Sequence, residues 1–212
     1  MSFTLGMILH PTYFAPLIQY IALVNAREVT FEIEDNYQKQ TYRNRCYIYG
    51  ANGKQLLTVP VMHSKNNKRQ KTKEVKIDNS FSWQKLHVKA IQIAYRSSPY
   101  FEFYEDEIIP VIIKNHKFLI DLNLETNQII FDVLQHEFSS KRTNDYQEKY
   151  TDMQDFRGLV NAKSTTKYNF QLYQQVFADK HNFIPNLSIL DLLFSEGPNT
   201  INYLEGHKNL LF

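Results

Sequence analysis

Hydrophobic and polar positions divide the first part of the chain into a strand, a helix and a second strand. The apolar run Thr4–His10 ends abruptly at a proline, which is typical of a buried strand. Apolar side chains then recur at helical spacing, at Leu17, Tyr20, Ile21 and Val24. Glu28–Glu34 alternates apolar and polar residues with the period of a strand. This order predicts a βαβ unit with parallel strands and a right-handed crossover.

The next segment predicts a β-hairpin. Arg43–Tyr49 and Gln55–Val61 have strand patterns, and Asn52-Gly53 between them tolerates the positive φ angles of a tight turn. After the hairpin, Lys65–Lys76 is polar and rich in lysine, so we expect an exposed, mobile loop. This loop could act as a lid over an anionic ligand, contact nucleic acid, or serve only as a solubilising surface loop.

Helical spacing dominates the second half. Ser82 is a predicted N-cap, and its helix should end near Pro99, because the residue before a proline disfavours helical backbone. Further helices are predicted over Tyr100–Lys114, over Asp121–Phe138, and from Leu187 to a stop at Gly197-Pro198, whereas Ser139–Lys167 has loop character. We therefore predict one α/β domain over residues 1–212, with an N-terminal βαβ unit plus hairpin in a mixed sheet and a helical C-terminal half.

The bulk composition supports a folded core and points to no strongly charged partner. Hydrophobic residues are 43% and charged residues 22% of the 212 residues, within the globular range. With 24 basic and 22 acidic residues, the formal net charge of +2 argues against nucleic acid or an anionic membrane as partner. The sequence lacks the features of a signal peptide, and no apolar run approaches the roughly 20 residues of a membrane span. We expect a cytoplasmic protein without membrane insertion, and a homo-oligomer is compatible with the sequence.

Two single residues have alternative interpretations. Cys46 is the only cysteine, so no intrachain disulfide can form, which fits a reducing compartment. Its neighbour Arg45 could lower the thiol pKa and create a reactive thiolate, whereas the alternative is a small buried residue in a strand. Asp191 lies in an apolar helical pattern, where it either faces solvent or pairs with a buried group.

Common catalytic and cofactor signatures are missing. The sequence has no G-x-S-x-G, no glycine-rich phosphate loop and no H-E-x-x-H, and its seven histidines lack zinc-ligand spacing. We therefore expect no metal site, and the sequence identifies no cofactor. His10 is a candidate acid–base catalyst, because it follows the first strand of the βαβ unit, where ligands of open α/β sheets bind. The alternative is a histidine tied into the turn by backbone bonds, and both interpretations extend to Tyr13 in the same loop.

Polar and aromatic residues crowd the segment between the second strand and the hairpin. The candidate substrate-binding residues there are Asn36, Tyr37, Lys39, Tyr42, Arg43, Asn44 and Arg45. Amides suit sugar hydroxyls or a base edge, tyrosine rings can stack, and lysine or arginine can hold phosphate or carboxylate. In a strand, Arg43 and Arg45 would share a face and either converge on one anion or line a solvated surface. This segment predicts the wall of a pocket at the carboxyl edge of the sheet.

Five segments in the same order resemble the WbqC-like protein family of bacteria, namely HPTYFAPLIQY, YQKQTYRNRC, NGKQLLTVPV, WQKLHVKAIQIAYRSSPYFEFY and FIPNLSILDLLFSEGPN. The histidine of the family's H-Q-P loop corresponds to Leu9, and His10 stands at the usual glutamine, which is a departure from the family pattern. The family's lysine and Asn-Arg pair correspond to Lys39, Asn44 and Arg45, and Tyr42 replaces its tryptophan. His87 matches as it stands, so the resemblance makes it a second candidate for catalysis.

The resemblance implies a biological context more than a reaction, since members are often associated with gene clusters for surface polysaccharide such as O-antigen. We expect an enzyme that modifies, or transfers a group to, an activated nucleotide-linked sugar, so its substrate is an anionic or sugar small molecule. His10 or His87 would move the proton, and His10, Tyr13, Lys39 and Arg45 should line one concavity. The alternative is a non-catalytic binding or assembly protein of the same pathway.

Overall fold

The computed structural model describes residues 6–62 and 69–212. The strands are β1 (Gly6–Leu9), β2 (Val29–Phe31), β3 (Arg45–Gly50), β4 (Gly53–Thr58), β5 (Ser140–Arg142) and β6 (Met153–Asp155). The α-helices are α1 (Leu17–Val24), α2 (Trp83–Tyr95), α3 (Phe101–Ile113), α4 (Leu119–Val133), α5 (Ala178–His181), α6 (Ile189–Glu196) and α7 (Thr200–Gly206). Short 3-10 helices are η2 (Thr72–Glu74), η3 (Arg157–Val160), η4 (Gly197–Asn199) and η5 (Lys208–Leu210).

The strands form two sheets. A parallel sheet has the order β5-β2-β1-β6, and β3 pairs with β4 in an antiparallel hairpin. The expected α/β class, the parallel βαβ unit, the hairpin and the helices of the second half are thus confirmed. The arrangement differs in one respect, because the hairpin pairs only with itself among the described strands instead of joining a mixed sheet.

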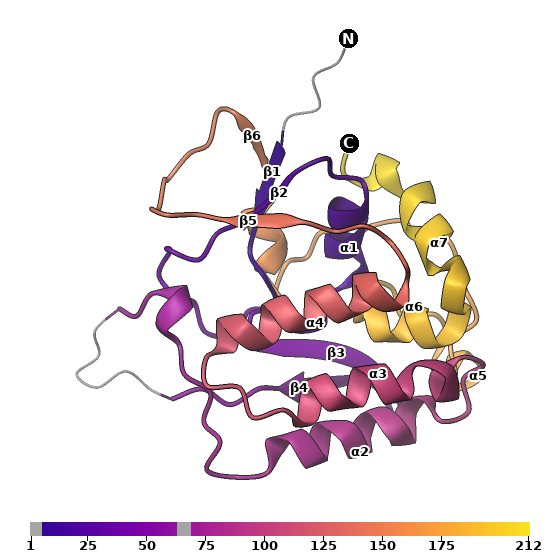
Figure 1. Ribbon diagram of the computed structural model, residues 1–212. Helices are drawn as coiled ribbons and strands as arrows, with labels where there is room; N and C mark the ends of the chain where they lie inside the picture. Colours follow the sequence, from indigo (N-terminus) through magenta and orange to yellow (C-terminus); the bar gives the residue numbers. More distant parts are fainter. Residues whose placement is uncertain (1–5, 63–68) are drawn as a thin grey trace.

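Figure 1 shows the parallel sheet at one end of the molecule and the hairpin with α2, α3 and α4 at the other. The first helix, α1, packs against α6 and α7, and β3 packs against α2 and α6. All eight residues of α1 are buried. Gln19, the polar residue among them, donates to the backbone oxygen of His10 and accepts from Thr12. Because both ends of this amide are bonded, its burial also fixes the loop that carries His10.

Two glycines mark turns that the sequence predicted. Gly53 closes the hairpin with φ +92°, a backbone conformation that glycine adopts without steric cost. Gly197 ends α6 with φ +54°, and a Cβ built there would lie 2.5 Å from the Tyr100 ring. The helix stop at Gly197-Pro198 therefore has two causes, the left-handed backbone and the close approach of an aromatic ring.

The segment Ser139–Lys167 contradicts its prediction as a loop, because it supplies both outer strands of the parallel sheet. All three residues of β5 are exposed, and β6 has no buried residue. Strands this short pair through their backbone at the edge of a sheet, so they need no apolar alternation. The sequence pattern therefore carried no signal for them.

Cys46 and Asp191 both lie in the core. Cys46 is buried in β3, and burial raises the pKa of its thiol well above the usual value, so the reactive-thiolate alternative is wrong. Asp191 is fully buried in α6 and accepts hydrogen bonds from Tyr95, Tyr173 and Gln175. Burial raises the pKa of Asp191 to about 6.

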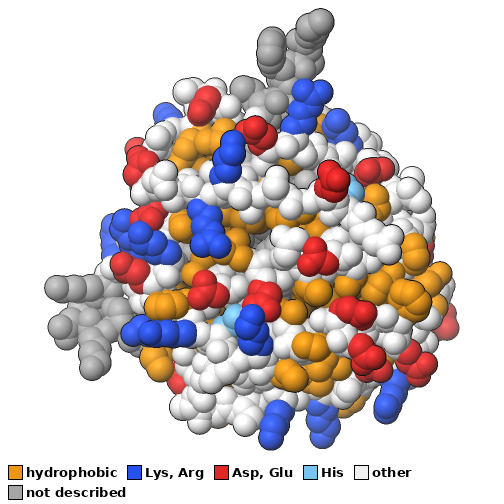
Figure 2. Space-filling model, in the orientation of Figure 1, with side chains coloured by type: hydrophobic (Ala, Val, Ile, Leu, Met, Phe, Trp, Pro, Cys, Tyr) orange, Lys and Arg blue, Asp and Glu red, His pale blue; other side chains and the backbone are white. Residues whose placement is uncertain are grey.

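Charged side chains of both signs are intermixed on the face shown in Figure 2, with hydrophobic patches between them. Within residues 6–62 and 69–212, no helix combines the length and apolarity needed to cross a bilayer.

Candidate functional site: a pocket at the carboxyl edge of the parallel sheet

A cavity of about 690 Å³ opens where the parallel strands end, and we call it the sheet-edge pocket. His10 follows β1, Asp35 follows β2, and Asp155 is the last residue of β6. Its other side is formed by Gln38, Lys39, Gln40, Thr41 and Arg43, before the hairpin, and by Arg157, Gly158, Asn161 and Lys163, around η3. Ligands of open α/β sheets bind beyond this edge, as the sequence predicted for this pocket.

The floor of the sheet-edge pocket is a buried triad of His10, Arg43 and Asp35. Arg43 is 1% exposed, and its Nη2 lies 2.5 Å from Asp35 Oδ2 and 2.9 Å from His10 Nε2. Because a guanidinium only donates, His10 Nε2 must accept this hydrogen bond. The proton of the neutral ring then lies on Nδ1, which is 3.3 Å from the backbone oxygen of Glu32.

Electrostatics agree with a neutral His10. Burial, followed by the positive charge of Arg43, lowers the pKa of His10 well below its usual value. Burial also raises the pKa of Asp35, while Arg43 and a hydrogen bond from Thr72 oppose that shift. The triad therefore holds a positioned cation next to a neutral imidazole at pH 7.

The segment after β2 is fastened to the lysine-rich region. Glu34 accepts from Lys71 Nζ at 2.7 Å and from Lys73 Nζ at 2.5 Å, and Thr72 Oγ1 donates to Asp35 Oδ1 at 2.6 Å. Within the expected loop Lys65–Lys76, Lys71, Lys73 and Lys76 are exposed as predicted, although residues 72–74 form η2. The mobility of this segment stays a prediction. Residues 63–68 lie outside the described residues, so the lid prediction stays untested there.

Arg157 is a second arginine of the pocket, which sequence reasoning missed. It donates to both carboxylate oxygens of Asp155 and to the backbone oxygens of Gln147 and Glu148. Its guanidinium also lies 4.9 Å from the centroid of the Tyr150 ring. The only sequence signal was the spacing Asp155-x-Arg157, and it lay in a hydrophilic segment whose strand had no periodicity.

The lining of the sheet-edge pocket has more cations than anions. Its basic residues are Lys39, Arg43, Arg157 and Lys163, and its acidic residues are Asp35 and Asp155, which leaves an excess of two positive charges. Both acidic residues already pair with an arginine. Amides and hydroxyls of Gln38, Gln40, Asn161, Thr41 and Tyr146 complete the lining. This chemistry suits a ligand that combines an anionic group with hydroxyls.

The sequence model of the WbqC-like protein family matches residues 11–171 and 148–203. The chain belongs to the WbqC-like protein family. It is also similar to a curated relative from Mycobacterium tuberculosis (strain ATCC 25618 / H37Rv), the uncharacterized protein Rv1507c. The two are 27% identical over 199 residues, which cover 79% of this chain and 83% of the relative. No solved structure matches.

Both ranges matched by the WbqC-like family contain Asp155 and Arg157, whereas His10 lies just before the first range. Of the ten site residues predicted from the sequence, the structure brings His10, Lys39 and Arg43 together in the sheet-edge pocket. The loop that carries His10 leads into α1, whose first N–H groups are not available to an anion. The first N–H groups of α1 are already bonded, Leu17 to the backbone of Leu187 and Ile18 to the side chain of Asn186.

Tyr13 and His87 lie away from the sheet-edge pocket of this WbqC-like protein, in the core beneath the hairpin. Tyr13 OH lies 3.0 Å from His87 Nδ1, and His87 Nε2 lies 3.2 Å from the backbone oxygen of Thr58. The carbonyl can only accept, so Nε2 carries the proton and Nδ1 accepts from Tyr13. Burial lowers the pKa of His87 to about 4. The geometry gives both residues structural contacts, and the expected concavity is wrong for Tyr13.

The remaining predicted residues also lie outside the pocket lining. Asn44 fastens the start of the hairpin, since its side-chain Nδ2 donates to the backbone oxygen of Val59 and its backbone oxygen accepts from the Val59 N–H. Arg45 is the first residue of β3 and pairs with Thr58. It does not line the sheet-edge pocket, so the expectation that it shares a concavity with His10 is wrong as well. Asn36 bridges to Lys71, and Tyr37 is half-buried beside it. Tyr42 lines a second, adjoining cavity.

Proposed function

We propose that this WbqC-like protein binds an activated, nucleotide-linked sugar in the sheet-edge pocket and modifies it or transfers a group to it during bacterial surface-polysaccharide synthesis. The observation that carries the binding part is the excess of two cationic side chains in a 690 Å³ cavity beyond the parallel strands. The polysaccharide context is supported by the family resemblance alone.

Different residues of the sheet-edge pocket would bind different groups of the ligand. Lys39 and Lys163 are exposed on the rim, where their ammonium groups attract a phosphate or carboxylate. Arg43 below them is held in place by Asp35 and His10, so its charge is oriented before a ligand arrives. The amides of Gln38, Gln40 and Asn161 supply the mixed donors and acceptors that sugar hydroxyls need.

A non-catalytic binding protein of the same pathway is the second candidate, and the state of His10 favours it. A general base needs a free lone pair, but His10 Nε2 already accepts from Arg43 at 2.9 Å. Proton transfer through His10 therefore requires Arg43 to turn from Nε2 toward the ligand. Incubating the protein with a nucleotide-sugar and a small-molecule extract of bacterial cells, which supplies group donors, distinguishes an enzyme from a binder. Modification or group transfer changes the mass of the recovered nucleotide-sugar in a mass spectrum, whereas binding alone leaves it unchanged.

The binding proposal is tested by thermal unfolding with nucleotide-linked hexoses and hexose 1-phosphates. A true ligand at about 100 times its Kd adds about 2.7 kcal/mol to the free energy of unfolding. Lys163→Glu should weaken binding about ten-fold, equivalent to about 1.4 kcal/mol, because it reverses a charge on the rim. Lys85→Glu, an exposed charge reversal on α2, is the matched control and should leave affinity unchanged. Equal losses in both variants, or no stabilisation by any of these ligands, would contradict the proposal.

A further inference from the structure

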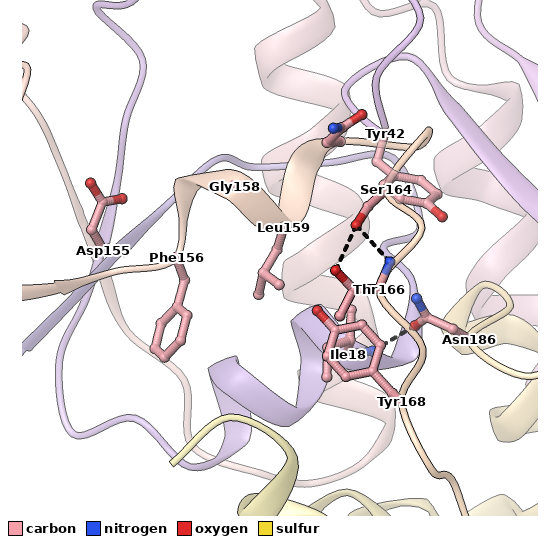
Figure 3. A pocket seen from close by; sticks show the side chains of 11 residues that line it. Ile18, Tyr42, Asp155, Phe156, Gly158, Leu159, Ser164, Thr166, Tyr168 and Asn186 are labelled. Atoms are coloured by element: carbon pink, nitrogen blue, oxygen red, sulfur yellow. Dashed lines mark hydrogen bonds between the residues drawn. The ribbon is translucent and has the colours of Figure 1, made fainter.

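A second cavity of about 300 Å³ adjoins the sheet-edge pocket, and we call it the tyrosine cavity. Asp155, Gly158 and Asn161 line both cavities, so the two meet at η3. Figure 3 shows the tyrosine cavity with Leu159 and Tyr168 reaching in from different sides, and Ile18 of α1 beside Tyr168. One ligand of sufficient length can therefore occupy both spaces.

The chemistry of the tyrosine cavity differs from that of the sheet-edge pocket. No lysine or arginine occurs among the described residues that line it. Its walls include the apolar or aromatic side chains of Ile18, Phe156, Leu159 and Tyr168. Such surfaces favour a flat, weakly charged ring and offer no cation to pair with a phosphate.

Polar groups at the edge of the tyrosine cavity have unused hydrogen-bonding capacity. Asn186 Oδ1 accepts from the N–H of Ile18 at 2.9 Å, and its Nδ2 has no partner among the described residues. Thr166 Oγ1 accepts from Ser164 at 3.0 Å, which leaves its own hydroxyl proton for another acceptor. The hydroxyl of Tyr42 likewise has no hydrogen-bond partner within the described part of the chain. A ring with donors and acceptors on its edge matches these groups.

We infer that the tyrosine cavity is the nucleobase subsite of a nucleotide-linked sugar whose phosphates pass Gly158 to reach the cations of the sheet-edge pocket. This inference rests on the proposed function. It assigns the nucleobase to the tyrosine cavity and the phosphates and sugar to the sheet-edge pocket. A nucleobase combines a flat ring with a polar edge, as the tyrosine cavity requires. The phosphates and the sugar carry the negative charge and the hydroxyls that the sheet-edge pocket suits.

Gly158 provides a test, because it lies where the two cavities meet. A Cβ built on Gly158 meets no atom within 4 Å, so a larger side chain fits there and projects into open space. Gly206 at the end of α7 also has open space around its Cβ and lines neither cavity. Gly158→Leu and Gly206→Leu are thus a matched pair, and Tyr168→Ala is a second variant that removes a wall of the tyrosine cavity without touching the crossing point.

The experiment measures affinities by calorimetry for UDP-, GDP-, ADP- and CDP-linked hexoses and for the corresponding hexose 1-phosphates, with melting temperatures confirming that each variant is folded. The tightest nucleotide-sugar should bind wild-type protein at least ten-fold more tightly than its hexose 1-phosphate. Gly158→Leu and Tyr168→Ala should both remove this advantage, and Gly206→Leu should not change it. Tyr168→Ala, which lies outside the sheet-edge pocket, should also leave hexose 1-phosphate binding within about two-fold.

Two outcomes overturn the inference, and only the second one also contradicts the proposed function. If wild-type protein binds nucleotide-sugar and hexose 1-phosphate equally, or if neither Gly158→Leu nor Tyr168→Ala reduces the advantage, the nucleobase subsite is wrong while the proposed function stands. If neither class of ligand binds, the proposed function fails and the subsite fails with it.

Discussion

His10 and His87 lie in two regions with similar polar chemistry and opposite surroundings. Each histidine is buried and neutral, and each has both ring nitrogens within hydrogen-bonding distance of a partner. The neighbours of His10 line a cavity of about 690 Å³, whereas His87 packs edge-on against Trp83 at 5.0 Å under the hairpin. Residue type and burial alone therefore do not distinguish a candidate ligand-binding histidine from a structural histidine of the core in this fold. The cavity beside His10 makes the difference.

The largest effect on the free energy of unfolding is expected from Arg43→Met, at the base of the sheet-edge pocket. Removing the guanidinium leaves the carboxylate of Asp35 buried without its cation, which should cost about 3–5 kcal/mol of unfolding free energy. Denaturant unfolding of Arg43→Met and of the double variant Asp35→Asn/Arg43→Met measures this cost. The double variant should regain part of the stability, and a double variant no more stable than the single one would show that the pair is not the cause.

A pH effect of about 3 kcal/mol is expected on the side of the hairpin core. The pKa of His87 is lowered from 6.5 to about 4, so the unfolded chain binds the proton more readily than the folded one. The contribution of His87 to stability is therefore complete above pH 6.5 and falls as the pH drops toward 4, by about 1.4 kcal/mol per unit of pKa shift. Wild type should be about 2 kcal/mol more stable than His87→Leu at pH 7, and this difference should fall to zero and reverse its sign as the pH approaches 4. A difference that is constant from pH 7 to pH 4 would contradict the buried, neutral assignment.

At pH 7, His87→Leu should cost about 2 kcal/mol, because the hydroxyl of Tyr13 and the carbonyl of Thr58 each lose a partner in the core. Ligand affinity in the sheet-edge pocket should not change. Melting temperature and calorimetric affinity on the same preparation test both statements. Lost affinity in a variant of unchanged stability would return His87 to the candidate catalytic residues.

The smallest effect is expected from Arg45→Lys. Arg45 does not line the sheet-edge pocket, so affinity should stay within about two-fold and stability within about 0.5 kcal/mol. Parallel titrations of wild type and variant with the same nucleotide-sugar give the answer. A loss of ten-fold or more would mean that the ligand contacts the start of β3, and the boundary of the site would have to be redrawn.

The sequence predicted those parts of the fold in which side-chain periodicity reflects burial. The βαβ unit and the helices α2, α3, α4 and α6 carried that signal. The turn at Gly53 was predicted from the Asn52-Gly53 pair, and the short helices α5 and α7 were not predicted. The outer strands β5 and β6 carried none, because the exposed edge of a sheet is stabilised by backbone hydrogen bonds. Arg157 was missed together with them, since its place in the site depends on where β6 ends.

The sequence predicted where the candidate site lies, but only some of the residues that line it. The rule that ligands bind beyond the carboxyl ends of parallel strands located the pocket, and it placed His10, Lys39 and Arg43 there. The rule could not show that Tyr13 turns inward to His87, because that contact joins residues 74 positions apart in the chain. The rule also could not show that the Asn44 side chain donates a hydrogen bond to the backbone oxygen of Val59.

The most direct test of the comparison is a side-chain ¹H–¹⁵N NMR spectrum of the two imidazoles during titration with a nucleotide-linked sugar. Without ligand, both rings should be neutral at pH 7, with the proton on Nδ1 in His10 and on Nε2 in His87. With ligand, the His10 signals should shift saturably, since Arg43 beside it takes part in binding, and the His87 signals should stay in place. Saturable shifts at His87 with none at His10 would contradict the account.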